Sequence, residues 1–367
     1  MSDRKYAEAG VDYSKIDPSK LLAQELAAKT AQHLGRLNLE EVAGSRGESA
    51  YIVKMGAVSI AFVTEALGTK NLVADAVRAY TGRTHYDAIA RDTVATILND
   101  LCSVGARPAA LTAYWGAGDG EWFSDAERAR DLTQGWAAAC EECRVSWGGG
   151  ETQVLPSLIE AGRVVLGGSA IGLITPSENT LHGERLEAGD QILLAPAAGI
   201  HANGLSLARK IAAGLPQGYQ TLISDGRTYG EALLDPTPQY APLIENLQNA
   251  GVPLHYAAHI TGHGWRKIMR ASRQLTYVLH KIPAVPPVLS FLQQHAELST
   301  EEAYGTLNMG AGFALYLPAS AVDAALTVGK QSGFELLHAG EVRVGPQRVV
   351  IEPLNITFEG DSLQVRR

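Results

Sequence analysis

The chain has 367 residues, 46% of them hydrophobic, and a formal net charge of −8. This length predicts two domains of roughly 100–200 residues, and the acidic balance without a basic stripe argues against nucleic acid or an anionic membrane as a partner. Three cysteines, Cys102, Cys140 and Cys143, are too few for a disulfide framework, and the polar N-terminal residues lack the apolar core of a signal peptide. We therefore expect a cytoplasmic protein.

Periodicity and turn residues predict alternating strands and helices in the first half of the chain. The expected elements are an N-terminal arm or loop at 1–20, helices at 21–35, 87–108 and 124–145 (with Ser124 as N-cap), strands at 51–65, 108–118 and 162–174, and a strand, turn and loop at 145–156.

The second half repeats this alternation. Strands are expected at 191–197, 274–280, 311–317 and 347–351, and helices at 204–213, 236–250, 287–298 and 320–332. The polar stretch 175–190 separates the halves, so we predict domains 1–175 and 176–367. Alternating strands and helices in both halves indicate α+β or α/β domains.

Several familiar catalytic signatures are absent from the sequence. It contains no P-loop, no dinucleotide-binding glycine fingerprint and no zinc-protease or nucleophile-elbow motif. Cys140 and Cys143 form a C-x-x-C inside a predicted helix, but a zinc site needs about four ligands and no second pair exists. We interpret these cysteines as ordinary helix residues.

The informative residues are acidic. Glu65 ends a predicted strand, Asp92 and Asn99 are about two helical turns apart on one helix face, Asp100 flanks that face, and Glu151 follows three glycines. Mg²⁺ bound to ATP takes a few carboxylates together with phosphate oxygens. Singly, each residue could be a surface charge or a turn. The polar pair in the apolar helix segment A-T-I-L-N-D-L-C-S-V-G-A, however, requires partners.

Three glycine-containing loops add candidate binding sites. H-A-N-G-L-S-L-A-R-K (201–210) places a helix N-terminus beside His201 and Asn203, a geometry that suits anions. The other two are H-I-T-G-H-G-W (259–265) and N-M-G-A-G-F (308–313). Structural alternatives for the three loops are a helix cap, a tight turn and a strand with glycine bulges.

Together these motifs resemble the aminoimidazole ribonucleotide (AIR) synthase, or PurM, family. The matching segments run in family order: Y-A-E-A-G-V-D-Y at 6–13, the T-E-A-L-G-T-K segment around Glu65, D-A-I-A-R-D-T-V-A-T-I-L-N-D-L-C-S-V-G-A-R-P, G-G-G-E-T, and the three loops above. The resemblance extends from about residue 6 to about residue 352. The H-x-N-G-x-S-L-x-R-K loop is the segment most specific to the cyclo-ligase branch.

The resemblance implies a two-domain α+β fold, with an N-terminal domain that forms a dimeric β-barrel and a C-terminal α/β sandwich. It implies a homodimeric, ATP- and Mg²⁺-dependent cyclo-ligase of purine biosynthesis. The enzyme would phosphorylate the amide oxygen of formylglycinamidine ribonucleotide, a ring nitrogen would attack the activated carbon, and phosphate would leave.

The resemblance also assigns roles to residues. Metal ligands would be Glu65, Asp92 and Asp100, and catalytic residues would be Asp100, Glu151 and His201. Nucleotide or substrate contacts would come from Lys70, Asn99, Gly149, Gly150, Thr152, Asn203, Gly204, Gly262 and Gly264.

The chain departs from the family at four places. The run of glycines that precedes the first strand in the family is reduced to A-G-S-R-G-E-S (43–49). Glu65 replaces an aspartate, Ala66 replaces a glycine whose backbone freedom it would restrict, and His263 displaces a glycine of the T-G-G-G loop. These departures leave two alternatives open. One is another enzyme of the superfamily, which phosphorylates a different small molecule. The other is a nucleotide-binding regulatory paralogue without catalysis.

Overall fold

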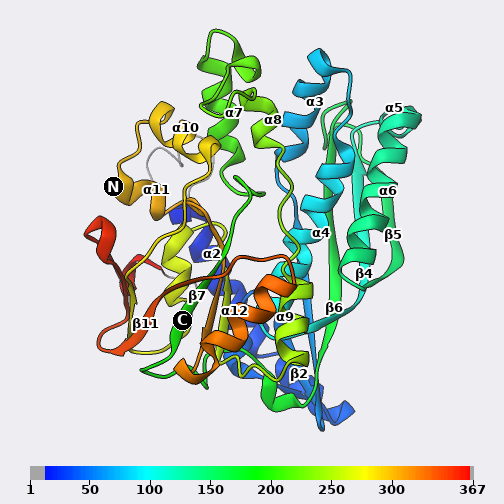
Figure 1. Ribbon diagram of the computed structural model, residues 1–367. Coiled ribbons are helices and arrows are strands. Elements are labelled where there is room, and N and C mark those ends of the chain that lie inside the picture. Colours follow the sequence, from blue (N-terminus) through cyan, green and yellow to red (C-terminus); the bar gives the residue numbers. More distant parts are fainter. Residues whose placement is uncertain (1–12, 364–367) are drawn as a thin grey trace.

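The computed structural model describes residues 13–363, so residues 6–12 of the opening motif lie outside the described part. Within these residues the strands form two sheets (Figure 1), one six-stranded with the order β1-β2-β3-β6-β4-β5 and one seven-stranded with the order β13-β12-β9-β11-β7-β10-β8. The first sheet ends at Ile174 and the second begins at Gln191. The two sheets and their helices confirm the expected two-domain α+β class.

The strands that the sequence predicted lie close to their expected bounds, whereas those at 40–41, 256–259, 337–344 and 356–359 were not predicted. The first sheet contains β1 (Glu40–Glu41), β2 (Tyr51–Met55), β3 (Val58–Ala66), β4 (Arg107–Ala117), β5 (Ser146–Val154) and β6 (Val164–Ile174). The second contains β7 (Gln191–Pro196), β8 (Tyr256–His259), β9 (Leu275–Leu279), β10 (Ala311–Leu317), β11 (Leu337–Val344), β12 (Arg348–Ile351) and β13 (Ile356–Glu359).

Helices accompany both sheets. The first half contains α2 (Tyr13–Ala28), α3 (Lys70–Thr81), α4 (Tyr86–Ser103), α5 (Glu121–Ser124) and α6 (Ala126–Glu142). The second half contains α7 (Leu205–Gly214), α8 (Tyr229–Leu233), α9 (Ala241–Asn249), α10 (Pro287–His295), α11 (Thr300–Tyr304) and α12 (Val322–Gln331).

Three sequence expectations were wrong in detail. The predicted arm at 1–20 gives way to helix α2 from Tyr13 onwards. Asp125, not Ser124, caps α6, because its carboxylate accepts a hydrogen bond from the Arg128 backbone N–H. The glycines before Glu151 do not form a turn. They continue strand β5, where Gly149 and Gly150 have φ of 100° and 157° beside a register shift against β4.

The two faces of the first sheet differ in burial. Helices α4 and α6 cover one face (Figure 1), while the opposite face exposes apolar side chains: Phe62 on β3, and Ile171 and Leu173 on β6, are 42%, 46% and 44% exposed. Adjacent exposed apolar side chains on neighbouring strands are unusual for a surface that faces only water.

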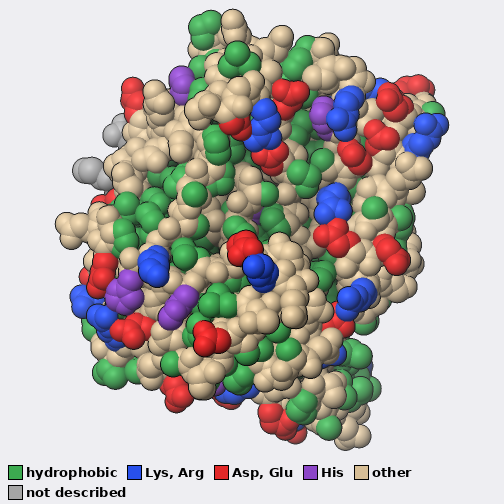
Figure 2. Space-filling view, in the orientation of Figure 1, with side chains coloured by type: hydrophobic (Ala, Val, Ile, Leu, Met, Phe, Trp, Pro, Cys, Tyr) green, Lys and Arg blue, Asp and Glu red, His purple; other side chains and the backbone are tan. Residues whose placement is uncertain are grey.

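On the face shown in Figure 2, Lys and Arg side chains are interspersed with Asp and Glu. None of the helices within residues 13–363 is both long enough and apolar enough to cross a membrane.

Candidate active site

A cavity of about 290 Å³ lies where the end of β3, helix α4 and the loop after β8 meet. Its charged and polar lining includes Glu65, Asp100, Asn203, His259, Lys267 and Arg270. A larger cavity of about 660 Å³ beside α2 contains none of the residues that the sequence singled out. Because the chemistry-bearing side chains gather in the smaller cavity, we take it as the candidate active site.

Asp100 and His259 form a hydrogen-bonded pair in this cavity. The Nδ1–H of His259 donates to Asp100 Oδ1 at 2.6 Å. Burial alone would raise the pKa of Asp100, but the hydrogen bond from His259 and the charge of Lys267 hold it below its ordinary value. Burial lowers the pKa of His259 despite the nearby carboxylate, which favours the neutral ring. Its Nε2 atom is buried without a partner among the described residues and can accept a hydrogen bond from a ligand.

Glu65 reaches the same cavity from the end of β3. Burial, reinforced by the negative charge of Asp100, raises the pKa of Glu65 to about 7, while Lys267 opposes the rise. Two carboxylates that repel each other in a partly dry cavity are a suitable place for a divalent cation. Glu65 and Asp100 therefore fit the few carboxylate ligands that Mg²⁺ needs beside phosphate oxygens.

Asp92, the third predicted metal ligand, lies elsewhere. Its carboxylate pairs with the ammonium of Lys70 at 2.7 Å, and both side chains are fully buried. The Thr237 backbone N–H donates to Asp92 at 2.8 Å, and Lys70 also donates to the Asp235 carbonyl at 2.9 Å. Since neither Asp92 nor Lys70 lines the cavity, we do not carry Asp92 into the proposed metal site.

Asn99, like Asp92, forms hydrogen bonds that join the first half of the chain to the second half. Its amide Nδ2 donates to the Pro238 carbonyl at 2.9 Å, and its Oδ1 accepts from the Tyr240 backbone N–H at 2.8 Å. The polar pair Asn99 and Asp100 thus finds two different sets of partners. Asn99 binds the segment 238–240, and Asp100 faces the cavity.

The H-A-N-G loop places its residues at different depths. Asn203 lines the cavity, whereas the His201 ring is 2% exposed, and neither of its ring nitrogens has a partner among the described residues. Burial, together with His259 and Lys70, lowers the pKa of His201 well below its ordinary value, so this ring is neutral. Gly204, with φ of 88°, caps helix α7 in the left-handed conformation that favours glycine.

Glu151 and Thr152 are exposed on β5, an edge strand of the first sheet. Register relates them to the cavity, because Glu65 pairs with Gly168, Gly168 with Ala113, and Ala113 with Gly150. Three strand spacings place Gly150 about 14 Å from Glu65. The structure does not bring Gly149, Gly150, Glu151 and Thr152 into the cavity, and their role in nucleotide binding stays a prediction.

The departures from the family are accommodated locally. His263 adopts the left-handed conformation itself, with φ of 70°, and lines the cavity beside Gly262. Burial and the cations Lys267 and Arg266 lower the pKa of His263 to about 3. Ala66 pairs with Gly167 in the β3–β6 ladder, so it occupies extended backbone that any residue adopts. The restriction expected at Ala66 is therefore not imposed.

Sequence reasoning missed Lys267 and Arg270, which follow the H-I-T-G-H-G loop. They lie three residues apart at a 3₁₀ helix, Gly264–Met269, where residues i and i+3 share a side. Arg270 donates to the Gly47 carbonyl and to Ser49 Oγ at 2.8 Å each. A pair of cations at this spacing after a glycine loop was the signal available in the sequence.

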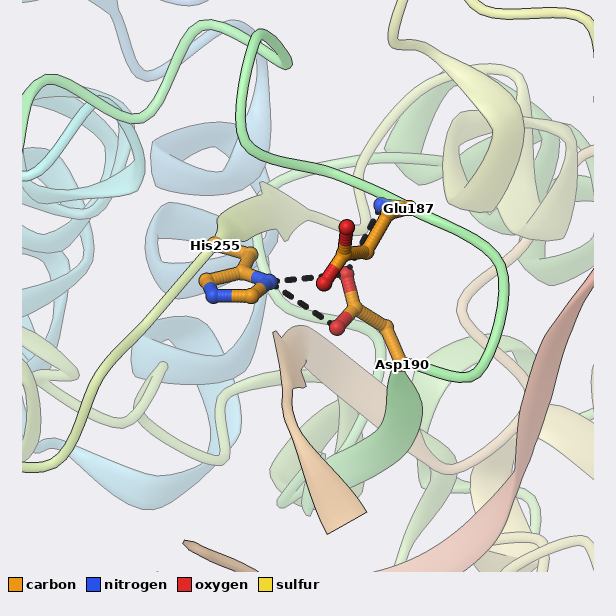
Figure 3. Close-up of side chains that lie close together, drawn as sticks. All are labelled: Glu187, Asp190 and His255. Carbon is orange, nitrogen blue, oxygen red and sulfur yellow. Dashed lines mark hydrogen bonds and ion pairs between the residues drawn. The ribbon is translucent and has the colours of Figure 1, made fainter. Parts of the chain in front are cut away.

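A second carboxylate–histidine pair lies outside the cavity (Figure 3). His255 Nδ1 lies 2.9 and 3.1 Å from the two oxygens of Asp190, and Asp190 also accepts from the Glu187 backbone N–H at 3.0 Å. Because both Asp190 oxygens have internal partners, we interpret this cluster as a structural link before β7.

Comparison with known proteins places this architecture in one class, the AIR synthase-related proteins. The family's N-terminal domain model matches residues 47–174, and its C-terminal domain model matches residues 187–352. A solved structure of the hydrogenase maturation protein HypE in complex with ATP shares the fold, with a TM-score of 0.59 and 19% identity over 83% of this chain and 84% of that chain.

The most informative relatives are curated archaeal proteins. Phosphoribosylformylglycinamidine cyclo-ligase from Methanobrevibacter smithii is 33% identical over 84% of this chain and 86% of its own length. The protein of the same name from Methanothermobacter thermautotrophicus is 32% identical over 88% and 90%. The chain belongs to the AIR synthase-related family.

Proposed function

We propose that this protein is an ATP-dependent cyclo-ligase that converts formylglycinamidine ribonucleotide to aminoimidazole ribonucleotide. The main support is the sequence similarity to archaeal proteins named phosphoribosylformylglycinamidine cyclo-ligase, which extends over most of both chains. The cavity supports it, because three acidic side chains (Glu48, Glu65 and Asp100), three cations (Lys20, Lys267 and Arg270) and the amide side chain of Asn203 line it.

The reaction needs a better leaving group than an amide oxygen. Transfer of the terminal phosphate of ATP to that oxygen forms a new P–O bond and releases ADP. An amidine nitrogen of the substrate, which becomes a ring nitrogen of the product, then attacks the activated carbon and loses a proton. The C–O bond breaks, and phosphate departs as the imidazole ring closes. Bound Mg²⁺ would neutralise charge on the phosphate oxygens during the transfer.

Named residues would carry the supporting roles. Glu65 and Asp100 would hold Mg²⁺, and Asn203 would bind the substrate amide. His259, kept in one tautomer by Asp100, would present its Nε2 lone pair to a substrate N–H. Glu151 and Thr152 are proposed to complete the nucleotide site.

We also propose that the protein is a homodimer that buries the exposed face of the first sheet. The side chains of Phe62, Ile171 and Leu173 on that face support a second copy as the occupant. Sheet-on-sheet packing would remove these apolar groups from water and would bring two six-stranded sheets together.

The direct test measures phosphate release from Mg²⁺–ATP with and without formylglycinamidine ribonucleotide, together with chromatography of the imidazole product. Release that depends on the ribonucleotide and yields aminoimidazole ribonucleotide is expected. Binding of nucleotide without any stimulation of phosphate release by that substrate would refute the cyclo-ligase activity. The remaining readings would then be an enzyme that phosphorylates another small molecule, or a regulatory protein.

The two carboxylate–histidine pairs provide a matched control. Asp100→Asn should lower the rate of Mg²⁺-dependent turnover by a factor of about 10² or more. Asp190→Asn, in the pair outside the cavity, should leave turnover within a few-fold. Equal activity in both variants would contradict the proposed metal site.

A further inference from the structure

Lys267 is a buried cation in the cavity whose charge the protein itself does not fully pair. It exposes only 9% of its surface and follows the loop Thr261–Gly264. A buried ammonium is expensive unless it is hydrogen-bonded and paired with an opposite charge. The contacts of its Nζ atom therefore indicate whether it has a structural role or a binding role.

Nζ of Lys267 donates to Thr261 Oγ1. Across residues 13–363, Lys267 forms no ion pair within 4.0 Å, although the carboxylates of Glu65, Asp100 and Glu48 are near enough to influence its charge. An ammonium carries three donors, so two N–H groups are left for a ligand in the cavity.

Two of these three carboxylates, Asp100 and Glu48, already have other partners. Asp100 accepts from His259, and Glu48 accepts from the Tyr256 hydroxyl and lies 3.5 Å from Arg270. Lys70 provides a contrast within the same protein, because it forms a buried ion pair with Asp92 and also donates to the Asp235 carbonyl. Lys267 is thus arranged as a binding cation and Lys70 as a structural one.

We propose that Lys267 binds a phosphate group that enters this cavity, with Thr261 as the residue that positions its ammonium. The phosphate belongs either to the end of the nucleotide or to the sugar of the substrate, and this inference rests on the proposed function. Burial and the neighbouring Arg270 lower the pKa of Lys267 to about 8, so the free side chain is still largely charged at neutral pH. A phosphate dianion would supply an opposite charge within hydrogen-bonding distance of the ammonium, which none of the nearby carboxylates supplies.

The test compares Lys267→Met and Lys267→Gln with the exposed control Lys330→Met on α12, by calorimetry on the full-length protein with Mg²⁺. One pair of ligands is a non-hydrolysable ATP analogue and ADP. The other pair is formylglycinamidine ribonucleotide and the nucleoside that lacks its phosphate. Each pair gives an affinity ratio that measures recognition of one phosphate.

We expect one ratio to fall about 10- to 100-fold in both Lys267 variants and to stay unchanged in Lys330→Met. A fall in the nucleotide ratio assigns Lys267 to the terminal phosphate, and a fall in the substrate ratio assigns it to the sugar phosphate. Unchanged ratios in variants that melt like the wild type would overturn the proposal.

Two further measurements keep this result separate from the cyclo-ligase assignment. If the wild-type protein does not bind formylglycinamidine ribonucleotide, the proposed function fails. The nucleotide ratio and the affinity for inorganic phosphate then decide the role of Lys267, and unchanged values in its variants overturn it. Thr261→Val retains the lysine and should give a smaller change in the same ratio than Lys267→Met gives.

Discussion

Replacing Asp92 by asparagine distinguishes a structural ion pair from a metal ligand. Lys70 and Asp92 are both fully buried with 2.7 Å between Nζ and Oδ2. The substitution keeps an acceptor for the Thr237 N–H but leaves the Lys70 ammonium with only the Asp235 carbonyl. Loss of one partner from a buried pair costs about 3–5 kcal/mol, which corresponds to a melting temperature lower by roughly 6–20 °C.

The assay is thermal and urea unfolding of Asp92→Asn, Lys70→Met and the double variant. The double variant should recover at least about half of the summed loss, because it removes both charges. Calorimetric titration with Mg²⁺–ATP completes the comparison. An Asp92→Asn protein that is as stable as wild type but no longer binds Mg²⁺–ATP would refute the ion-pair reasoning and return Asp92 to the metal site.

Three other predictions follow from single positions. Metal-free Glu65 has a pKa of about 7 instead of 4.5, so the folded protein binds more protons than the unfolded chain in that window and loses stability as pH rises through it. In EDTA, Glu65→Gln should therefore be more stable than wild type by about 1–3 kcal/mol at pH 8, and the two proteins should be equally stable at pH 4. Equal melting curves at pH 8 would contradict the raised pKa of Glu65. Ile171→Asp should convert a dimer to a monomer in analytical ultracentrifugation, whereas Val344→Asp, at an exposed position of the second sheet, should not; a dimer in both variants would exclude this face. Gly264→Ala should destabilise the protein by about 2 kcal/mol or more, because φ is 53° and a Cβ would lie 2.3 Å from the Tyr304 carbonyl oxygen. A free energy of unfolding in urea equal to that of the wild type would contradict this expectation and show that the loop can shift.

The sequence alone predicted most elements of the fold and the family. Short apolar runs predicted β6 and β10, because such a run is a local feature of the sequence. Burial of β10 along its whole length fits a run without alternation. The predicted helix 21–35 covers only the second half of α2, and residues 13–20 escaped prediction because they are polar and contain Pro18, which is typical of a loop. The glycines 148–150 predicted a turn, but pairing with β4 keeps them in a strand. Such pairing depends on a partner far away in the sequence.

Only the tertiary structure shows which polar residues of helix α4 have a structural role and which face the cavity. Asp92, Asn99 and Asp100 share one helix, and nothing in their spacing tells which of them meets the segment 235–240 and which meets the cavity. Lys267 and His259 join Asp100 only after β8 and the following loop pack against α4. A sequence determines which side chains are available, whereas burial and the charges brought close by folding determine whether each one supports the structure or binds a ligand.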